Sequence, residues 1–246
     1  VTLGAWIDGN LEKNRQEIET LIEAGRQNNP RIIRLMVGNE VILRDDIPKA
    51  ALIDYIREVK KRSWRPVSTS ETWDVWLKNP DLVAEVDFIA VHLLPYWEGI
   101  AADDAVDYAF DRFHEVQQAY PNKPIIITEV GWPSDGQPFK HAIPSISNQA
   151  KFLREFLNRA DAEKVTYYIV EAFDQPWKKS IEGSAGAYWG IFNADRQPKY
   201  PMDTDVLAMP GWKNWAAGAA VFSMVLMGLF LFTRSTLKLP GVVFFG

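Results

Sequence analysis

Two glutamates stand at the ends of short apolar runs and have the residue type and setting for acid–base chemistry. Glu40 closes the run at 37–39, and Glu129 follows the run at 126–128. A strand that is buried on both faces has no use for a charge, so a carboxylate at its last residue either emerges into a cleft or carries a desolvation cost. The two residues lie too far apart in the chain for a local salt bridge or a helix cap. Two carboxylates delivered from two strand ends are what glycoside hydrolysis requires.

The composition narrows the class of protein. The chain has 246 residues, 47% of them hydrophobic, and a net charge of −5, with an isoelectric point near 5.3. This length suits one large domain with a sizeable core, and the acidic balance argues against a nucleic-acid partner. There is no Cys, and His92, His114 and His141 lie far apart, so the sequence predicts neither a metal site nor a cofactor. Ten Trp is a high count, and flat apolar rings are useful in carbohydrate-binding clefts.

Strand-like and helix-like segments alternate from the first residue to about residue 171. We expect strands at 1–7, 31–38, 66–70, 87–93, 123–129 and 165–171, and helices at 11–27, 47–62, 72–79, 101–120 and 147–160. Strands separated by helices of this length are typical of βα units and a parallel sheet. Functional residue types at the strand ends favour an α/β fold, a (β/α)8 TIM barrel truncated at its N-terminus, with six βα units visible. A doubly wound open sheet is the alternative, but no Gly-rich nucleotide loop follows any strand.

The last part of the chain differs in kind. Residues 215–232 contain no charge and meet the length of a transmembrane helix at its short end. Lys213 precedes this run, and Arg234 and Lys238 follow it, a positive excess that favours a cytoplasmic C-terminus. A helix buried in a soluble core is the alternative. We therefore expect a barrel domain at 1–210, a transmembrane helix at 213–234 and the start of a further, truncated segment at 235–246.

Five segments, in this order and spacing, carry a family resemblance. They are 37–40 (VGNE), 91–97 (VHLLPYW), 128–134 (TEVGWPS), 171–178 (EAFDQPWK) and 188–193 (YWGIFN). Together they resemble family 17 of the glycoside hydrolases, and in particular its bacterial branch of membrane-linked β-1,3-glucan glucanosyltransferases and hydrolases. The resemblance covers roughly residues 1–200. It implies a (β/α)8 barrel that acts on β-1,3-glucan without a cofactor.

The resemblance implies roles for the two glutamates and their neighbours. Glu40 is implied as the general acid/base, Glu129 as the nucleophile of a glycosyl-enzyme intermediate, and Asn39 as the residue that holds the substrate's 2-hydroxyl. Tyr96 resembles the tyrosine that donates a hydrogen bond to the nucleophile. Since the acid must be protonated near neutral pH, we expect the pKa of Glu40 to be raised and that of Glu129 to stay low.

Other residues of the same segments are candidates for binding sugar. Trp177 can stack on a glucose ring, and Glu171 and Lys178 can hydrogen-bond sugar hydroxyls. Glu171 could instead be a structural partner of Lys178. The remaining substrate-binding candidates are Asp174, Trp132 and Trp189, the two tryptophans being equally suited to the core.

Two more residues lie at strand ends. Glu71 follows the strand expected at 66–70 and is a further candidate for the cleft. His92 fits a buried histidine with its hydrogen bonds satisfied better than it fits an acid or a base. Neither is assigned a role in the chemistry.

The sequence favours a retaining enzyme acting on β-1,3-glucan over two alternatives. One is a membrane-anchored, non-catalytic β-glucan-binding module, which needs aromatic rings in a groove but not two carboxylates within reach of one glycosidic bond. The other is a β-1,4-glucanase of the same clan, against which the segment 171–178 argues. The expected partners are a β-glucan oligo- or polysaccharide and a membrane contacted through residues 215–232, with no nucleic acid. The expected location is the bacterial inner membrane, with the catalytic domain in the periplasm.

Overall fold

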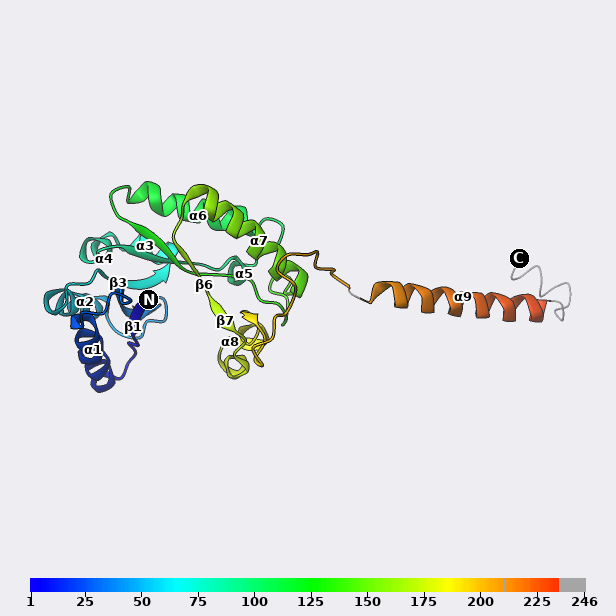
Figure 1. Cartoon of the computed structure of the whole chain (residues 1–246), viewed down its shortest axis with the longest axis horizontal. Helices are drawn as coiled ribbons and strands as arrows, with labels where there is room; N and C mark the ends of the chain where they lie inside the picture. The colour runs from blue at the N-terminus through cyan, green and yellow to red at the C-terminus, as the bar shows by residue number, and fades with distance from the viewer. Residues whose placement is uncertain (210, 235–246) are drawn as a thin grey trace. The chain divides into compact units, whose positions relative to one another are not determined.

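The chain forms two units, seen in a computed structural model that describes residues 1–209 and 211–234. Val1–Val206 is one compact unit, and a second unit begins at Leu207. Figure 1 shows the first unit as strands surrounded by helices and the second as mainly one helix, α9. The residues that position the predicted chemistry all belong to the first unit.

A six-stranded parallel sheet forms the centre of the first unit. Its strands are β1 (Thr2–Ala5), β2 (Arg34–Asn39), β3 (Val67–Thr72), β4 (Ile89–Leu93), β5 (Ile125–Val130) and β6 (Tyr167–Ile169). Each strand pairs with the next one along the chain, so the order in the sheet is the order in the sequence. This order is that of a barrel wall, whereas a doubly wound sheet reverses its direction at a switch point. The six predicted βα units are confirmed, and the doubly wound alternative is wrong.

Helices connect the strands and cover the outer face of the sheet. They are α1 (Leu11–Arg26), α2 (Lys49–Arg62), α3 (Trp73–Lys78), α4 (Pro80–Glu85), α5 (Pro95–Glu98), α6 (Ala105–Ala119) and α7 (Ile146–Glu163). Asn10 caps α1 by accepting a hydrogen bond from the Lys13 N–H, and Ser145 caps α7 by accepting one from Asn148. Such caps satisfy N–H groups that the first turn of a helix leaves free, which fixes where each helix begins.

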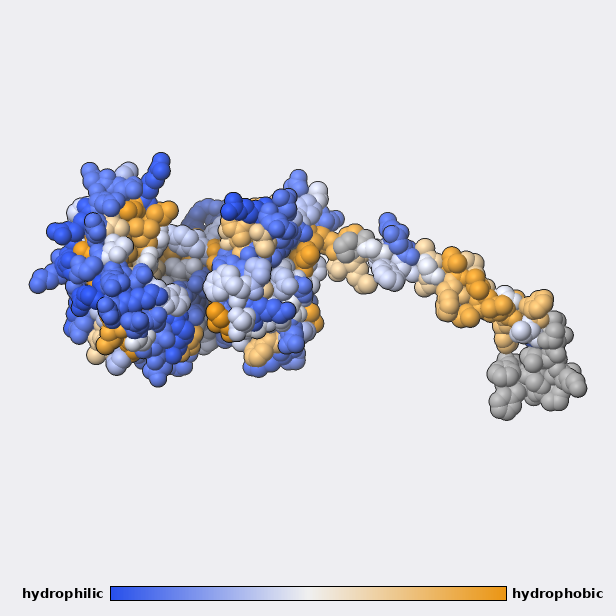
Figure 2. All heavy atoms as spheres, turned by 90° about the horizontal axis from the view of Figure 1, so that it is seen from below, coloured by the Kyte–Doolittle hydropathy of each residue, from blue (hydrophilic) through white to orange (hydrophobic). Residues whose placement is uncertain are grey.

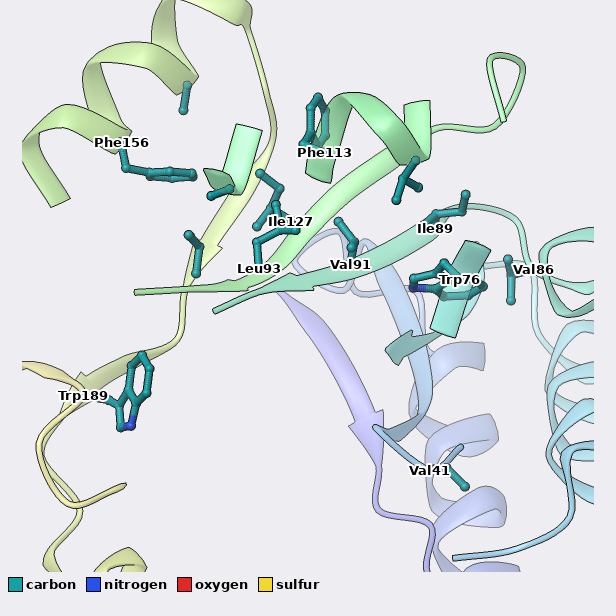
Figure 3. Close-up of a cluster of buried hydrophobic side chains, with 14 of the residues drawn as sticks. Val41, Trp76, Val86, Ile89, Val91, Leu93, Phe113, Ile127, Phe156 and Trp189 are labelled. Carbon is teal, nitrogen blue, oxygen red and sulfur yellow. The ribbon is translucent and has the colours of Figure 1, made fainter. Parts of the chain in front are cut away.

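The main core lies between the sheet and these helices. Val91 and Ile127 of the strands are completely buried and belong to the same cluster as Trp76, Phe113 and Phe156 of the helices (Figure 3). A smaller cluster on the inner face of the sheet contains Met36, Phe88, Ala90 and Ile126. Successive side chains of a strand point to opposite faces, so the inner face is separate from this helix-packed core.

The sheet is strongly curved. Thr2 of β1 and Tyr168 of β6 lie at opposite ends of the strand order, yet their hydroxyl oxygens are 3.1 Å apart. The six strands therefore enclose their inner face as a half-barrel. In such a wall all parallel strands present their carboxyl ends at the same rim, where barrel enzymes place their chemistry.

A second, two-stranded parallel sheet follows, which the sequence did not predict. β7 (Glu171–Phe173) pairs with β8 (Gly190–Phe192), and the 3-10 helix η1 (Pro176–Lys178) and α8 (Lys179–Gly186) connect them. The strand expected at 165–171 therefore ends at Ile169, and Glu171 opens a new strand. Only glycine fits at position 190, because a Cβ there would lie 2.2 Å from the Asp174 nitrogen.

The helix α9 (Trp212–Arg234) dominates the described part of the second unit. It is long and apolar enough to cross a membrane, and no part of its most apolar stretch is buried inside the chain. Figure 2 shows the apolar side chains along it. The span across a membrane stays a prediction, and the alternative of a helix buried in a soluble core finds no support in the described residues. The further segment expected at 235–246 lies outside the described residues.

Candidate active site

A cleft of about 1300 Å³ opens at the carboxyl ends of the strands in the first unit. The lining residues at the ends of β2 to β5 are, in strand order, Asn39 and the following Glu40, Thr72, His92 and Glu129. The segment from β6 to β8 supplies further lining residues, among them Glu171, Lys178 and Glu182. A concave site with apolar walls and a few convergent polar groups is the usual form of a ligand-binding site.

Glu40 reaches the cleft because the chain leaves β2 through an unusual turn. Gly38 and Glu40 both have positive φ, 81° and 54°. At position 38 only glycine fits, because a Cβ would lie 2.4 Å from the side chain of Val41. The Glu40 N–H donates to the Ser70 carbonyl oxygen at 2.7 Å, which ties the turn to β3. A left-handed conformation at a residue with a Cβ is costly and persists where its surroundings fix it, often at functional sites.

Glu129 stays within a strand, at a point where the strand pairing is irregular. It lies within β5, and the ladder pairs it with His92 of β4, after a register shift between Val91 and His92. Its side chain is 27% exposed and lines the cleft. The structure thus brings Glu129 and Glu40 to one rim from two strands that are far apart in the sequence.

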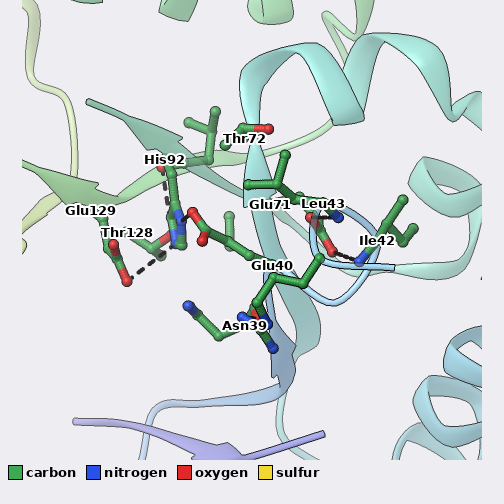
Figure 4. A network of polar contacts seen from close by, with 12 residues as sticks. Asn39, Glu40, Ile42, Leu43, Glu71, Thr72, His92, Thr128 and Glu129 are labelled. Atoms are coloured by element: carbon green, nitrogen blue, oxygen red, sulfur yellow. Dashed lines mark hydrogen bonds and ion pairs between the residues drawn. The ribbon is translucent and has the colours of Figure 1, made fainter. Parts of the chain in front are cut away.

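His92 lies between the two carboxylates. Its Nδ1 is 2.8 Å from Oε1 of Glu40, and its Nε2 is 3.7 Å from Oε1 of Glu129 (Figure 4). The side chain is 1% exposed, and Nε2 has no hydrogen-bond partner among the described residues. His92 is buried, as predicted, but it is not fully satisfied and it belongs to the site. The sequence held one indication of this, because side chains alternate between the two faces of a strand and His92 lies two residues from the inward-facing Ala90.

The same three side chains form the one group in the described residues whose spacing suits a metal ion. One atom each from Glu40, His92 and Glu129 lie within 4.8 Å of one another. The 2.8 Å separation of Nδ1 and Oε1 is that of a hydrogen bond. A metal bound through these two atoms would have to displace that bond, so we describe the group as a hydrogen-bonded pair facing a second carboxylate.

The protonation pattern of the site differs from the expected one. Burial alone raises the pKa of Glu40, but the hydrogen bond from His92 and the charges of His92, Arg44 and Lys178 outweigh it and lower the pKa. Burial raises the pKa of Glu129, the charge of His92 offsets this only in part, and the charge of Glu40 adds a smaller increase. Burial lowers the pKa of His92, but the two carboxylates reverse this and raise it. The expected raised pKa at Glu40 and low pKa at Glu129 are therefore wrong here, because the hydrogen bond from His92 lowers the pKa of Glu40 and burial raises that of Glu129.

A second charged cluster lines the cleft. Lys178 pairs with the buried carboxylate of Glu171 and lies 3.7 Å from Glu182 of α8. Burial lowers the pKa of Lys178, but the Glu171 hydrogen bond and charge reverse this and raise it. Burial also raises the pKa of Glu171 and of Glu182. Glu171 is thus a structural partner of Lys178 while both line the cleft. Sequence reasoning missed Glu182, for which the signal was its i,i+4 spacing from Lys178.

Aromatic rings line much of the cleft. Trp177 is 60% exposed, with the Lys178 Nζ 6.0 Å from its ring centre. Trp189 is 3% exposed and borders the cleft from the core, and its buried indole nitrogen has no partner among the described residues. Three further lining tryptophans were not predicted, namely Trp6, Trp73 and Trp97. The high Trp count pointed to them, but only the folded chain shows which ones reach the cleft.

Two predicted aromatic site residues lie in the core instead. Tyr96 is 3% exposed, and its hydroxyl donates to the Gln137 carbonyl oxygen at 2.7 Å instead of to Glu129. Trp132 is fully buried, with its ring centre 6.0 Å from that of Tyr96. A strand-end position alone does not aim a side chain at the cleft. The segments after β4 and β5 bring these two rings against each other, so both rings serve packing.

Asp174 is also structural. Its Oδ1 lies 2.6 Å from the Lys199 Nζ and accepts the Gly190 N–H at 3.0 Å. Both side chains of the ion pair are largely buried. The predicted contact of Asp174 with sugar is therefore replaced by a pair that fixes the β7–β8 sheet, which no local sequence pattern revealed.

A half-barrel with two carboxylates at its carboxyl rim, facing an aromatic-lined cleft, defines the class of protein as a glycosidase. The BtgE/BtgC glycoside hydrolase domain matches residues 1–190 of the chain. The chain belongs to this glycoside hydrolase family.

Individual relatives agree with this family. A glucan 1,3-β-glucosidase of Arthroderma benhamiae is 31% identical over 225 residues, covering 84% of this chain and 72% of that protein. The glycoside hydrolase family 17 β-1,3-glucanosyltransferase of Rhizomucor miehei has a similar structure, with a TM-score of 0.71 and 33% identity over 82% of this chain and 75% of that one. An active-site mutant of the Rhizomucor enzyme in complex with laminaritriose gives a TM-score of 0.73 at 30% identity, covering 85% and 77%. The family 17 prediction is confirmed. The bacterial, membrane-linked branch stays a prediction, since these relatives are fungal.

Proposed function

We propose that the chain is a retaining enzyme that cleaves and transfers β-1,3-glucan through a covalent glycosyl-enzyme intermediate. The observation that carries the proposal is the proximity of the two carboxylates, since one oxygen of Glu40 and one of Glu129 lie within 4.8 Å. Retaining glycosidases hold their carboxyl groups about 5–5.5 Å apart, whereas inverting ones leave about 6.5–9.5 Å for a water molecule. The short separation favours direct attack by one carboxylate.

Two steps follow from this geometry. In the first, Glu129 attacks the anomeric carbon, the glycosidic C–O bond breaks, and the leaving oxygen takes a proton from Glu40. In the second, Glu40 takes a proton from an incoming hydroxyl, whose oxygen attacks the anomeric carbon and releases Glu129. Water as the acceptor gives hydrolysis, and a sugar hydroxyl gives transglycosylation. Asn39 lines the cleft beside Glu40, where it can hold the 2-hydroxyl.

The assignment of the acid to Glu40 comes from the family motif, and the lowered pKa of Glu40 opposes it. We reconcile the two through the 2.8 Å hydrogen bond with His92, in which a proton is held for Glu40. The raised pKa of Glu129 supports the reverse assignment, with Glu129 as acid and Glu40 as nucleophile, as the second candidate.

A trapping experiment separates the two assignments. A 2-deoxy-2-fluoro laminaribioside with a good leaving group should form a stable ester, which peptide mass spectrometry then locates. A label on the peptide that contains Glu129 supports our assignment, and a label on Glu40 reverses it. A chain that turns over glucan but is never labelled contradicts the covalent mechanism.

The proposed substrate rests on the relatives and on the cleft. The relatives are named for 1,3-β-glucan or were solved with laminaritriose, and the cleft offers aromatic rings and charged groups to a sugar chain. Digestion of laminarin and of a β-1,4-glucan by the full chain, with chromatography and linkage analysis, tests this. Binding without turnover would identify a glucan-binding module. Turnover of the β-1,4-glucan alone would identify a β-1,4-glucanase. Products longer than the substrate would identify transglycosylation.

We also propose that α9 anchors the protein in the bacterial inner membrane, with Val1–Val206 in the periplasm. The support is the apolar length of α9 and the basic Arg234 and Lys238 after the apolar run. A reporter fused after Lys238 should give a cytoplasmic signal, and alkaline phosphatase activity there would reverse the orientation. A chain ending at residue 209 should leave the membrane fraction, and its continued pelleting with membranes would contradict the anchoring role.

A further inference from the structure

Glu71 is a buried carboxylate that the proposed chemistry does not use. It is 0% exposed, and by strand alternation it shares a face of β3 with Thr69, not with the cleft-lining Thr72. The prediction of Glu71 as a cleft residue is therefore wrong. A buried carboxylate costs free energy unless its oxygens are hydrogen-bonded or paired with a cation. The contacts of Glu71 should therefore reveal what the carboxylate is retained for.

The carboxylate of Glu71 binds backbone. Its Oε1 accepts the Ile42 N–H at 2.8 Å, and its Oε2 accepts the Leu43 N–H at 3.3 Å. Figure 4 shows Glu71 turned toward these two residues. The two N–H groups belong to the turn after β2, so the carboxylate does for this turn what a capping side chain does for a helix end.

The same turn begins at Glu40. The Arg44 N–H returns to the Glu40 carbonyl oxygen at 2.9 Å, and the Glu40 N–H donates to the Ser70 carbonyl oxygen at 2.7 Å. Neighbouring residues of β3, Ser70 and Glu71, thus bind the start and the middle of the turn. These bonds act on a residue with a φ of 54°, a conformation that its surroundings must impose.

We propose that Glu71 is a positioning residue for the acid/base. It holds the turn so that the Glu40 carboxylate meets His92 and points into the cleft. The inference rests on the proposed function, because it assumes that Glu40 protonates the leaving group.

The charge state of Glu71 bears on this role. Burial raises the pKa of Glu71 to about 7, against the lowering effect of the two N–H groups, with Glu40 raising it and His92 lowering it. Those two groups, on the turn after β2 and on β4, are the charges that act on it from neighbouring elements. An ionised carboxylate accepts both N–H groups, whereas a protonated one carries a donor of its own and loses acceptor capacity. Replacing the carboxylate by an amide therefore imitates the protonated form, which binds the two N–H groups more weakly.

The test compares two substrates in the full chain. A laminari-oligosaccharide needs a proton on its leaving oxygen, and 2,4-dinitrophenyl β-laminaribioside does not, so only the first reports on the acid. Glu71→Gln keeps the shape but turns one acceptor into a donor. We expect kcat on the oligosaccharide to fall about 10–100-fold, since a small misplacement of a catalytic group costs up to this much. On the aryl glycoside we expect the rate of the first step, read from the burst of released dinitrophenol, to fall less than about threefold, whereas the second step needs Glu40 as a base with either substrate.

Thr69→Val is the matched control. Thr69 is fully buried on the same face of β3, and its hydroxyl has no hydrogen-bond partner among the described residues. We expect the same ratio of the two activities as in the unmodified chain. A Thr69→Val ratio shifted like that of Glu71→Gln would overturn the positioning role, because any disturbance of β3 would then suffice.

Equal losses in the first step with both substrates in Glu71→Gln would make Glu71 structural only and overturn the inference. If the unmodified chain turned over neither substrate, the proposed function itself would fail, which is a different outcome. Should Glu71→Gln not fold, Glu71→Met removes both acceptors without burying a charge. The same selective loss on the oligosaccharide is expected there, and an equal loss on both substrates again overturns the role.

Discussion

The two strand ends that carry the glutamates are built in opposite ways. Glu40 has left regular structure and sits at a φ of 54°, in a turn tied to β3 by Ser70 and Glu71. Glu129 remains within β5, and the ladder itself sets its place opposite His92. One carboxylate thus depends on hydrogen bonds made by side chains and a turn, and the other depends on the sheet. We infer that local changes can disturb Glu40 alone, whereas moving Glu129 requires moving a strand.

The two glutamates also differ in their electrostatic surroundings. Glu40 receives a 2.8 Å hydrogen bond from His92, whereas Glu129 is 3.7 Å from the other nitrogen of the ring. The pKa of Glu40 is lowered and that of Glu129 is raised as a result of burial and this unequal sharing. Burial and the unequal contacts of one histidine together make two chemically equal residues different.

The largest effect is expected at Glu129. Glu129→Gln removes the proposed nucleophile, so turnover of laminarin should fall at least about 10⁴-fold, because the proposed covalent step is lost. Glucan affinity, measured by calorimetry, should change little, since one contact among many is altered. Glu163→Gln, on the surface of α7, is the control and should keep its turnover. A Glu129→Gln chain with the unmodified rate would show that this strand end carries no chemistry.

Glu40→Ala should cost less, about 10²–10⁴-fold on laminarin, the usual contribution of a general acid or base. An aryl glycoside with a good leaving group should be cleaved with a much smaller loss in its first step. Azide should restore part of the turnover by taking the place of the deprotonated water. Rescue seen in Glu129→Ala but not in Glu40→Ala would exchange the roles of the two strand ends.

His92→Gln should weaken the distinction between the two glutamates and change the pH dependence of stability. The pKa of His92 is raised in the folded protein. The stability that its charge contributes is therefore fully present below the pKa of the unfolded chain, about 6.5, and is lost as pH rises through the pKa of the folded protein. Because the pKa of Glu40 is lowered, its contribution is present above its ordinary value of 4.5 and is lost as pH falls through the folded value. His92→Gln should therefore lower the free energy of unfolding by more at pH 5.5 than at pH 9.

Urea unfolding at the two pH values measures this difference. His114→Gln is the matched control, because His114 pairs with Glu163 at the surface, where solvent screens the interaction. A loss in His92→Gln that is the same at both pH values would show that the ring contributes packing and not charge.

The smallest effect is expected away from both strand ends. Trp177→Ala should weaken glucan binding by about 1–3 kcal/mol, the size of an aromatic stacking contact. KM should rise more than kcat falls, since stacking acts equally in the ground state and the transition state. Trp64→Ala is the control, because Trp64 is equally exposed, at 60%, and is not among the cleft-lining residues. A Trp177→Ala chain that melts many degrees lower would show that the ring is needed for folding.

Local sequence patterns were enough to predict the six βα units and the strand ends that carry Glu40 and Glu129. Apolar strand runs, amphipathic helices and polar strand ends are local patterns, and parallel strands place their carboxyl ends at one rim whatever their distance in the chain. Local chemistry does not specify where loops fold back, so the sheet of β7 and β8 and the end of β6 at Ile169 were missed.

Which side chains at that rim face the cleft, and how they are charged, follows only from the folded arrangement of the chain. Tyr96 and Asp174 occupy strand-end segments like those of the glutamates, yet they bond Gln137 and Lys199, residues brought near by separate loops. The pKa pattern likewise depends on where His92 lies between two distant carboxylates. Burial and charge act through space over a few ångströms, and the spacing of residues along the chain does not fix those distances.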